Sequence, residues 1–327
     1  RAFLLVAAGE CDERECDDLG YVCHPGLGCV PCHPRGRLCD GQTVVECMDN
    51  GFSTTPVAEC HPEDNEVCYL GNCVDACKAA DDARSYVGCE YWAVDLDNAT
   101  ISSVFNAAAQ QFAVVISNPS LVEARVIVER NDAAPGWPLQ LAQVAEATVP
   151  PQGLRVINLP PREVDGSPEG EYDTGTHTAL TSNAYRVTSS VPIIAYQFSP
   201  LDNVQVFSND ASLLVPTSAL DTKYLVMGWP QTIADTNDPR TDFHKNLRAF
   251  LTIVGTEVGT DVTIRLSTDI VGSDDIPAAS RGDEIQVTLR DGRNLKAVLV
   301  GTDPETDVAV IQVQADNLTD IPIAASD

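Results

Sequence analysis

Beyond residue 89 the chain alternates between short apolar runs and turn residues. The runs are rich in β-branched side chains and are bounded by Pro, Gly or Asn, a pattern typical of β-strands. Several are continuously apolar, which favours strands buried on both faces between packed layers. The pattern therefore predicts an all-β body with a sandwich-like arrangement. The runs that we expect to form strands are residues 112–116, 125–128, 154–157, 191–198, 224–227, 250–254 and 262–266.

Two further segments carry their own expectations. Residues 139–147 could form a short helix within the β-rich body. Near the end of the chain, apolar and polar residues alternate over 285–289, and Asp291-Gly292 is a signal for a two-residue hairpin turn. An apolar run over 295–300 returns, and 307–313 supplies another strand. We therefore expect a C-terminal β-hairpin segment.

Cysteine is confined to the front of the chain. Small regions bury too little surface to be stable alone, so dense cysteine in a short stretch indicates disulfides and an oxidising compartment. The even number is consistent with complete pairing, although the spacing does not give the connectivity. Residues 43–45 could add one short strand. The 12 cysteines of this expected disulfide region are Cys11, Cys16, Cys23, Cys29, Cys32, Cys39, Cys47, Cys60, Cys68, Cys73, Cys77 and Cys89.

One segment of this region also fits a haem motif. Residues 29–33 match CxxCH, in which Cys29 and Cys32 would bond the haem vinyl groups and His33 would supply an axial ligand. Such a short match arises easily by chance among many cysteines, so a disulfide framework is the preferred interpretation. Zinc is a third alternative, because His24 and His61 also lie among the thiols. The paired short cysteine spacings of tetrahedral zinc sites are absent, and we expect no cofactor.

Charge and hydropathy bound the classes of partner. The net charge is −28, from 20 Lys+Arg against 48 Asp+Glu, and such a field repels phosphate backbones and anionic lipid. No apolar run approaches the ~18–20 residues of a membrane span. Residues 1–8 are typical of the end of a signal peptide with a small-residue cleavage zone. We therefore expect a secreted or cell-surface protein whose partner is an extracellular protein or glycan.

The body holds few residues with obvious chemistry. Asp95 and Asp97 stand at calcium-loop spacing, but Ala99 and Thr100 replace the oxygen ligand and the glycine that an EF-hand requires. A capped turn is the preferred interpretation of these residues, with a metal site as the weaker alternative. Two histidines, at positions 177 and 244, lie outside any nucleophile, metal or acid–base motif. We expect both to be surface or structural residues.

A set of motifs in the body occurs in the order of a known family. The segment resembles the N-terminal domain family of IgG-Fc-binding proteins, in particular its bacterial, secreted, cysteine-headed members. The resemblance covers residues 86 to 280 and implies an extracellular, non-enzymatic β domain of an adhesion or mucus-like protein. The family name does not establish that this chain binds antibody. The motifs are GCEYWAVDLDN (88–98), FAVVISNP (112–119), AYRVTSSVPIIAYQF (184–198), NDASLLVP (209–216) and GWP (228–230).

The last 44 residues resemble a different family, the periplasmic Deg-type serine proteases. In that family the aspartate of the Thr-Asp-Val-Ala-Val motif orients the catalytic histidine, and Asp307 matches it. A triad needs all three members, because the aspartate only positions the imidazole that activates the serine. Residues 273–281 contain no histidine motif, and the expected Gly-Asn-Ser-Gly-Gly segment does not occur before Asp327. The segments that carry this resemblance are residues 284–293, 300–313, 317–319 and 324–327.

The join near residues 279–284 links two families that we would not expect in one domain, which indicates a chimeric, misassembled or engineered sequence more than a natural fusion. We expect a non-enzymatic, secreted or cell-surface binding or adhesion protein. One alternative is a fragment of a Deg-type endopeptidase of protein quality control, inactive as given; a c-type haem carrier is another. The expected segments are a signal-peptide-like remnant (1–10), a cysteine-rich region (11–89), a β-sandwich-like domain (90–283) and a partial protease segment (284–327).

Overall fold

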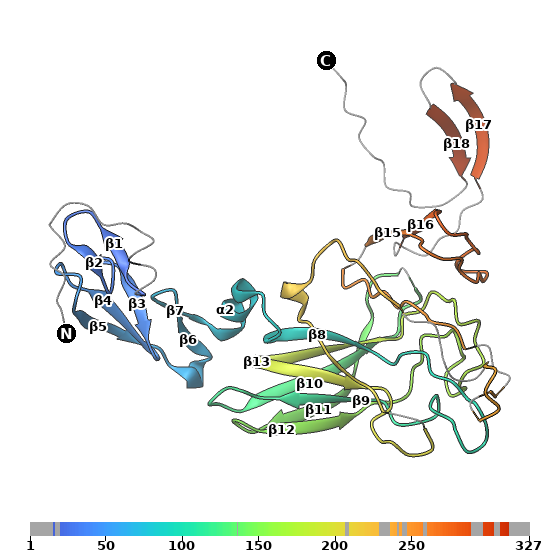
Figure 1. The fold of residues 1–327 in the computed structure, drawn as a ribbon, viewed down its shortest axis with the longest axis horizontal. Helices are drawn as coiled ribbons and strands as arrows, with labels where there is room; N and C mark the ends of the chain where they lie inside the picture. The colour runs from blue at the N-terminus through green and yellow to red at the C-terminus, as the bar shows by residue number, and fades with distance from the viewer. Residues whose placement is uncertain are drawn as a thin grey trace.

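In the computed structural model the regular secondary structure is mostly strands with little helix, which confirms the predicted all-β class. The front of the chain forms a small cysteine-rich head, and the strands that follow form a larger body (Figure 1). The structure describes residues 16, 20–135, 137–206, 209–228, 236–240, 242–243, 247–257, 260–288, 297–303 and 308–313. Within these residues no helix is long and apolar enough to cross a membrane.

The described part of the head consists of three small antiparallel sheets. The expected strand at 43–45 is part of the central strand of the second sheet. Few apolar side chains are buried here, and Val30, Val44 and Val45 are the largest of them. The strands are β1 (Val22–His24) with β2 (Gly28–Val30), β3 (Arg37–Asp40) with β4 (Thr43–Cys47) and β5 (Thr54–Glu59), and β6 (Glu66–Tyr69) with β7 (Asn72–Asp75), and η1 (Pro62–Asp64) is a single 3₁₀ turn before β6.

Disulfides connect these small sheets, as the cysteine pattern predicts. Cys23 is also disulfide-bonded, and Cys11 lies outside the described residues. Each bridge closes a loop of 12 to 29 residues, which restricts the unfolded chain and so stabilises a region with little apolar core. The five described bridges are Cys16–Cys29, Cys32–Cys47, Cys39–Cys68, Cys60–Cys73 and Cys77–Cys89.

Helix α2 (Ala76–Ala83) connects the head to the body (Figure 1). It begins at Asp75, whose carboxylate accepts a hydrogen bond from the Lys78 backbone N–H, and it ends at Arg84, which adopts the left-handed conformation. The Cys77–Cys89 bridge joins this helix to strand β8. The Arg84 guanidinium donates to the carbonyl of Leu220, so the helix is held both covalently and by hydrogen bonding.

The body is a seven-stranded antiparallel sheet organised around one long strand, β13. The first half of β13 pairs with β8 and β10, and its second half pairs with β9 and β14. Strand β11 extends the first set and β12 the second, so two sets of four strands share β13. The strands are β8 (Gly88–Val94), β9 (Ala113–Ser117), β10 (Ala124–Asn131), β11 (Leu141–Val149), β12 (Leu154–Asn158), β13 (Ala184–Phe198) and β14 (Ala211–Leu213).

This shared strand produces the sandwich-like arrangement that the apolar runs predict. The pairing of β13 with β8 shifts register between Thr188 and Ile193, which is where a strand bends as it passes from one layer to another. One apolar core fills the space between the layers, and alternate residues of each strand face it. Its buried members are Tyr91, Ala93, Phe112, Val114, Ile116, Ala124, Val126, Val128, Val149, Ile157, Leu159, Tyr185, Val187, Val191, Ile193, Ala195 and Leu214.

Two buried tyrosines have their hydroxyl groups satisfied within this core. Tyr91 donates to the carbonyl of Ile193 at 2.5 Å, and Tyr185 donates to the carbonyl of Pro160 at 2.5 Å. Each bond removes the penalty of burying a phenol, and burial raises the pKa of both groups well above its usual value. The Tyr185 bond also fixes the chain just beyond β12, which leads into the loops described below.

The predicted helix at 139–147 is wrong. Its residues lie in β11, which pairs along its whole length with β10, from Leu141 opposite Asn131 to Val149 opposite Ala124. Val144, Ala145 and Ala147 pack against the core from this strand. Pairing and burial therefore override the local preference of the segment.

Five of the seven predicted strands are confirmed by the structure, and two are not. Residues 112–116, 125–128, 154–157, 191–198 and 262–266 fall largely within described strands. Residues 224–227 and 250–254 form no strand in the described structure, and Leu225 and Met227 are 98% and 87% exposed. Apolar character alone does not make a strand where no partner strand lies alongside.

The C-terminal strands form antiparallel pairs, but each strand pairs with a partner other than the expected one. Strand β16 (Glu284–Thr288) pairs with β15 (Asp261–Arg265), and β17 (Ala297–Asp303) pairs with β18 (Val308–Val313). The predicted pairing of residues 285–289 with 295–300 is therefore replaced within the described residues, and Asp291-Gly292 lies outside them. The β15–β16 ribbon spans the expected join near residues 279–284.

Candidate functional site

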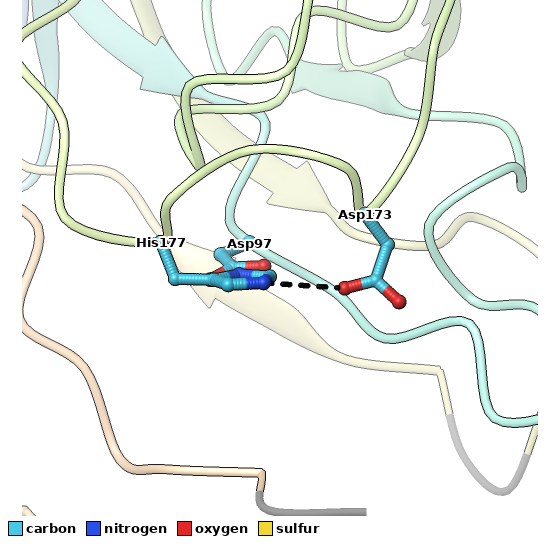
Figure 2. Close-up of side chains that lie close together, drawn as sticks. All are labelled: Asp97, Asp173 and His177. Atoms are coloured by element: carbon cyan, nitrogen blue, oxygen red, sulfur yellow. Dashed lines mark hydrogen bonds and ion pairs between the residues drawn. The ribbon is translucent and has the colours of Figure 1, made fainter.

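Polar side chains gather at the end of the sandwich where two connections meet. Asp97 lies just after β8, and Asp173 and His177 lie in the long connection between β12 and β13. Figure 2 shows the three side chains converging, with the His177 ring facing Asp173. One donor atom from each residue lies within 4.8 Å of the others. We call these three residues the Asp97 cluster.

The His177 imidazole lies between two carboxylates. Its Nδ1 atom is 2.9 Å from Asp97 Oδ2, and its Nε2 atom is 3.7 Å from Asp173 Oδ1. The His177 side chain is 48% exposed, whereas the side chains of Asp97 and Asp173 are each 14% exposed. The ring therefore covers the acidic groups from the solvent side.

Three further carboxylates lie beneath this cluster and are almost fully buried. Asp95 and Glu163 are each 5% exposed and Asp165 is 1% exposed. Glu163 accepts backbone hydrogen bonds from Asn98 and Asp173, which ties the two connections together. The surrounding backbone thus supplies hydrogen bonds but no positive charge.

Asp165 is held by its own loop. Its carboxylate accepts hydrogen bonds from the Ser167 backbone N–H, the Ser167 hydroxyl and the Gly175 backbone N–H. A side chain at Gly175 would collide with the carbonyl oxygen of Asp165, so only glycine allows this close approach. Asp173 and His177 both adopt the left-handed conformation, at φ 53° and 58°. The loop therefore has a specific, locally strained shape.

Burial shifts the proton affinities of these groups. Desolvation raises the pKa of Asp95 to about 7 and that of Glu163 to about 8, and the neighbouring charge of Asp165 adds to both shifts. Burial also raises the pKa of Asp97, against the lowering effect of His177. For His177, burial lowers the pKa, but the hydrogen bond to Asp97 and the nearby carboxylate charges outweigh it, so the net pKa is raised.

The chemistry open to this arrangement is the binding of a proton or a cation. The adjacent cavity is lined in part by Arg162, Glu163, Ser167 and Asn183 and has a volume of about 90 Å³. Cavities that hold organic ligands are larger, usually about 300–1,000 Å³. This cavity fits an ion with water, whereas a second cavity, which shares Arg162, Ser167 and Asn183 with it, has a volume of about 340 Å³.

Asp95 and Asp97, the two metal ligands that the sequence suggests, take different positions in the structure. Asp97 joins the cluster, whereas the Asp95 carboxylate accepts a hydrogen bond from the Arg162 backbone N–H and lies deeper. Sequence reasoning missed Asp173, and it treated His177 as an isolated histidine. The Asp-x-x-x-His spacing of these two residues was the available signal, but His177 stands 80 positions after Asp97, so the chain must fold back for the two to pair.

The structure leaves no free thiol for the haem alternative. Cys29 is bonded to Cys16 and Cys32 to Cys47, so neither sulfur can bond a vinyl group, and His33 lies exposed beside them. The protease residue Asp307 and the second body histidine, His244, lie outside the described residues.

Comparison with known proteins finds two families. A model of the family described as IgGFc binding protein matches residues 210–327. A protein of Halomonas elongata, described as a probable periplasmic serine endoprotease DegP-like, is 58% identical over 45 residues, which is 14% of this chain and 10% of that protein. The chain thus matches only about a tenth of this relative's length. No solved structure matches the chain.

The two matches confirm both resemblances found in the sequence, with a change in extent. The family match overlaps the expected range 86–280 only over 210–280, and it continues through the tail in which the Deg-type motifs occur. The match to the Halomonas protein is about as long as that tail. The chain therefore carries sequence similar to two families, which is compatible with a chimeric origin.

Proposed function

We propose that the protein is a secreted or cell-surface adhesion protein without catalytic activity, and that its partner is an extracellular protein. The match of residues 210–327 to the IgGFc binding protein family carries this proposal. The disulfides of the head support it, because they persist only in an oxidising compartment. The relative from Halomonas elongata is itself described as periplasmic.

An exposed apolar sheet face is our candidate for the contact surface. Val156, Val115, Tyr196 and Leu213 lie opposite one another in register across β12, β9, β13 and β14. Val156, Tyr196 and Leu213 are 49%, 37% and 45% exposed, and Leu154, two residues along β12 on the same face, is 66% exposed. Exposed apolar patches of this kind are typical of protein–protein contacts.

The charge of the chain indicates the chemistry of this partner. With a net charge of −28, the protein repels acidic surfaces and attracts basic ones. We therefore propose a protein partner that offers an apolar patch with a basic rim. An antibody Fc fragment is the first partner to test, because it is the one in the family's name.

Binding of the intact, oxidised chain to immobilised Fc, measured by interferometry, tests the proposal. We expect saturable binding that persists after the Fc glycan is removed and weakens as salt rises. The double variant Leu154→Ser/Val156→Ser should lose binding, whereas Leu70→Ser should not, because Leu70 is 78% exposed in the head, between β6 and β7. Binding lost on removal of the glycan would replace the protein partner with a glycan. The absence of saturable binding to Fc and to a panel of basic extracellular proteins would contradict the proposal.

A second candidate function follows from the 58% identity to the DegP-like protein. On this alternative the tail is part of a serine endopeptidase, and Asp307 is the residue that would orient a histidine. Incubation of the intact chain with unfolded casein distinguishes the two proposals. We expect no cleavage; cleavage that disappears in Asp307→Ala would favour the protease.

A further inference from the structure

The Asp97 cluster has the donor atoms of a metal site. We propose that Asp97, Asp173 and His177 together bind one divalent cation of the zinc or manganese class. Bonds to such ions are about 2.0–2.2 Å long, so donor atoms on opposite sides of one ion lie up to roughly 4.4 Å apart. The donors of the cluster lie within 4.8 Å of one another, so small side-chain adjustments bring them to bonding distance.

The negative charge around the Asp97 cluster favours the binding of a cation. Asp97 and Asp173 are mostly buried, and Asp95, Glu163 and Asp165 lie almost fully buried beneath them. Among the described residues, the ion pairs of Asp97 and Asp173 involve His177 alone. The nearby Arg162 guanidinium donates to the carbonyl of Asn131 instead. Buried carboxylates are stable when they are paired, protonated or bound to metal, and one imidazolium carries a single positive charge against the two carboxylates of Asp97 and Asp173.

A second feature is an oxygen without a donor. Asp95 is 5% exposed, yet the described donor to its carboxylate is the Arg162 backbone N–H, which reaches Oδ2. No described group donates to Oδ1. On Asp97, Oδ2 faces His177 and no described group donates to Oδ1 either. Neither Oδ1 atom belongs to the fully buried, unpartnered side-chain atoms of the described residues, so both keep some accessible surface through which a hydrated cation can reach them.

The mixture of donors decides between classes of metal. Calcium prefers six to eight oxygen ligands, as in the calcium loop considered for Asp95 and Asp97. Imidazole nitrogen favours zinc and similar ions, while carboxylate also suits manganese. Two carboxylates with one imidazole therefore favour the zinc or manganese class over calcium. The bound ion would join the connection after β8 to the connection before β13.

The competing occupant is a proton. A protonated His177 can donate to Asp97 through Nδ1 and face Asp173 through Nε2, which satisfies the ring without a metal. Metal binding requires one ring nitrogen to lose its proton, so binding by the metal releases a proton and weakens at low pH. The two occupants therefore differ in a measurable way.

Calorimetric titration of the intact, oxidised and untagged chain, stripped with EDTA and dialysed, tests the proposal with Zn²⁺, Mn²⁺ and Ca²⁺ separately. We expect one Zn²⁺ or Mn²⁺ per chain, a binding heat that varies with the ionisation enthalpy of the buffer because protons are released, and a raised melting temperature. Ca²⁺ should bind more weakly than the better of the other two ions.

The variants Asp97→Asn and His177→Gln should weaken binding by more than about tenfold. His61→Gln is the matched control. Like His177, His61 lies beside a carboxylate, Glu63 at 3.2 Å, but within the described residues it belongs to no three-residue metal cluster. Circular dichroism of each metal-free variant separates loss of binding from loss of folding. Binding that is absent, that is unchanged in both variants, or that is tightest for Ca²⁺ and independent of His177 would overturn the proposal.

Discussion

The head and the body offset the conformational entropy lost on folding in different ways. The head has three small described sheets and buries few large apolar side chains, and covalent bridges restrict its unfolded chain. The body has no cysteine after Cys89, and a single apolar core fills the space around β13. Conformational entropy opposes folding in both regions. The head reduces this cost in the unfolded state, and the body offsets it by burying apolar surface in the folded state.

Reduction of the disulfides should have the largest effect. A reductant under native conditions should unfold the head, because each closed loop of about 15 residues contributes roughly 3 kcal/mol by the chain-entropy estimate. The body should keep its strands. Hydrogen exchange with peptide-level resolution checks this, with loss of protection in β3–β5 and retained protection in β9, β10 and β13. Loss of protection in both regions at once would contradict the division.

A cavity in the core should have the opposite distribution. Ile193 is fully buried in the body, so Ile193→Ala should lower the free energy of unfolding of the body by about 2–5 kcal/mol. The oxidised head should keep its hydrogen-exchange protection. Leu70→Ala, at a side chain 78% exposed in the head, is the control and should change neither region. An equal loss of protection in the head would show that the two regions unfold together.

The buried carboxylates make the stability of the body sensitive to pH between pH 5 and pH 8. Burial raises the pKa of Glu163 from 4.5 to about 8 and that of Asp95 from 3.8 to about 7. The folded state therefore holds more protons than the unfolded state between these values, and the free energy of unfolding falls as pH rises. In EDTA we expect a loss of at least about 2 kcal/mol between pH 5 and pH 8, because each unit of pKa shift corresponds to about 1.4 kcal/mol. Urea unfolding at several pH values measures it, and Glu163→Gln should flatten the curve. Rising stability over this window would contradict the assignment.

The ion pairs of the sheet surface should matter least. Arg186 on β13 lies 2.8 Å from Glu90 on β8 and 3.7 Å from Glu129 on β10, and all three side chains are partly exposed. Arg186→Gln should lower the free energy of unfolding by about 1 kcal/mol or less, because water screens such pairs. Urea unfolding at low and high salt checks this. A loss as large as that of Ile193→Ala would mean that charge and not burial holds these strands.

Much of this organisation follows from local patterns in the sequence. Cysteine density predicts the disulfide-bonded head, and β-branched runs predict β9, β10, β12 and the second half of β13. Local patterns fail where pairing with another strand determines the secondary structure. The residues of β11 could form a helix on local preference alone, but pairing with β10 makes them a strand. They fail again at Leu225, which lies in an apolar run without a strand partner.

The candidate site was harder to predict than the fold. Asp97 is a candidate ligand in the sequence because Asp95 precedes it at calcium-loop spacing, but its partners lie in a connection that follows four further strands, β9 to β12. No local pattern encodes the return of His177 to Asp97. That contact depends on the left-handed turns at Asp173 and His177 and on the close approach at Gly175.

The Cys77–Cys89 bridge turns the link between head and body into a closed ring instead of a single thread. A protease that cuts any peptide bond between these two cysteines would therefore leave the head tethered through sulfur. Mechanical tension applied to the head would likewise pass directly from α2 into β8 and bypass the chain between them. A protein with this joint keeps its head attached under digestion and pulling, until the bridge itself is reduced.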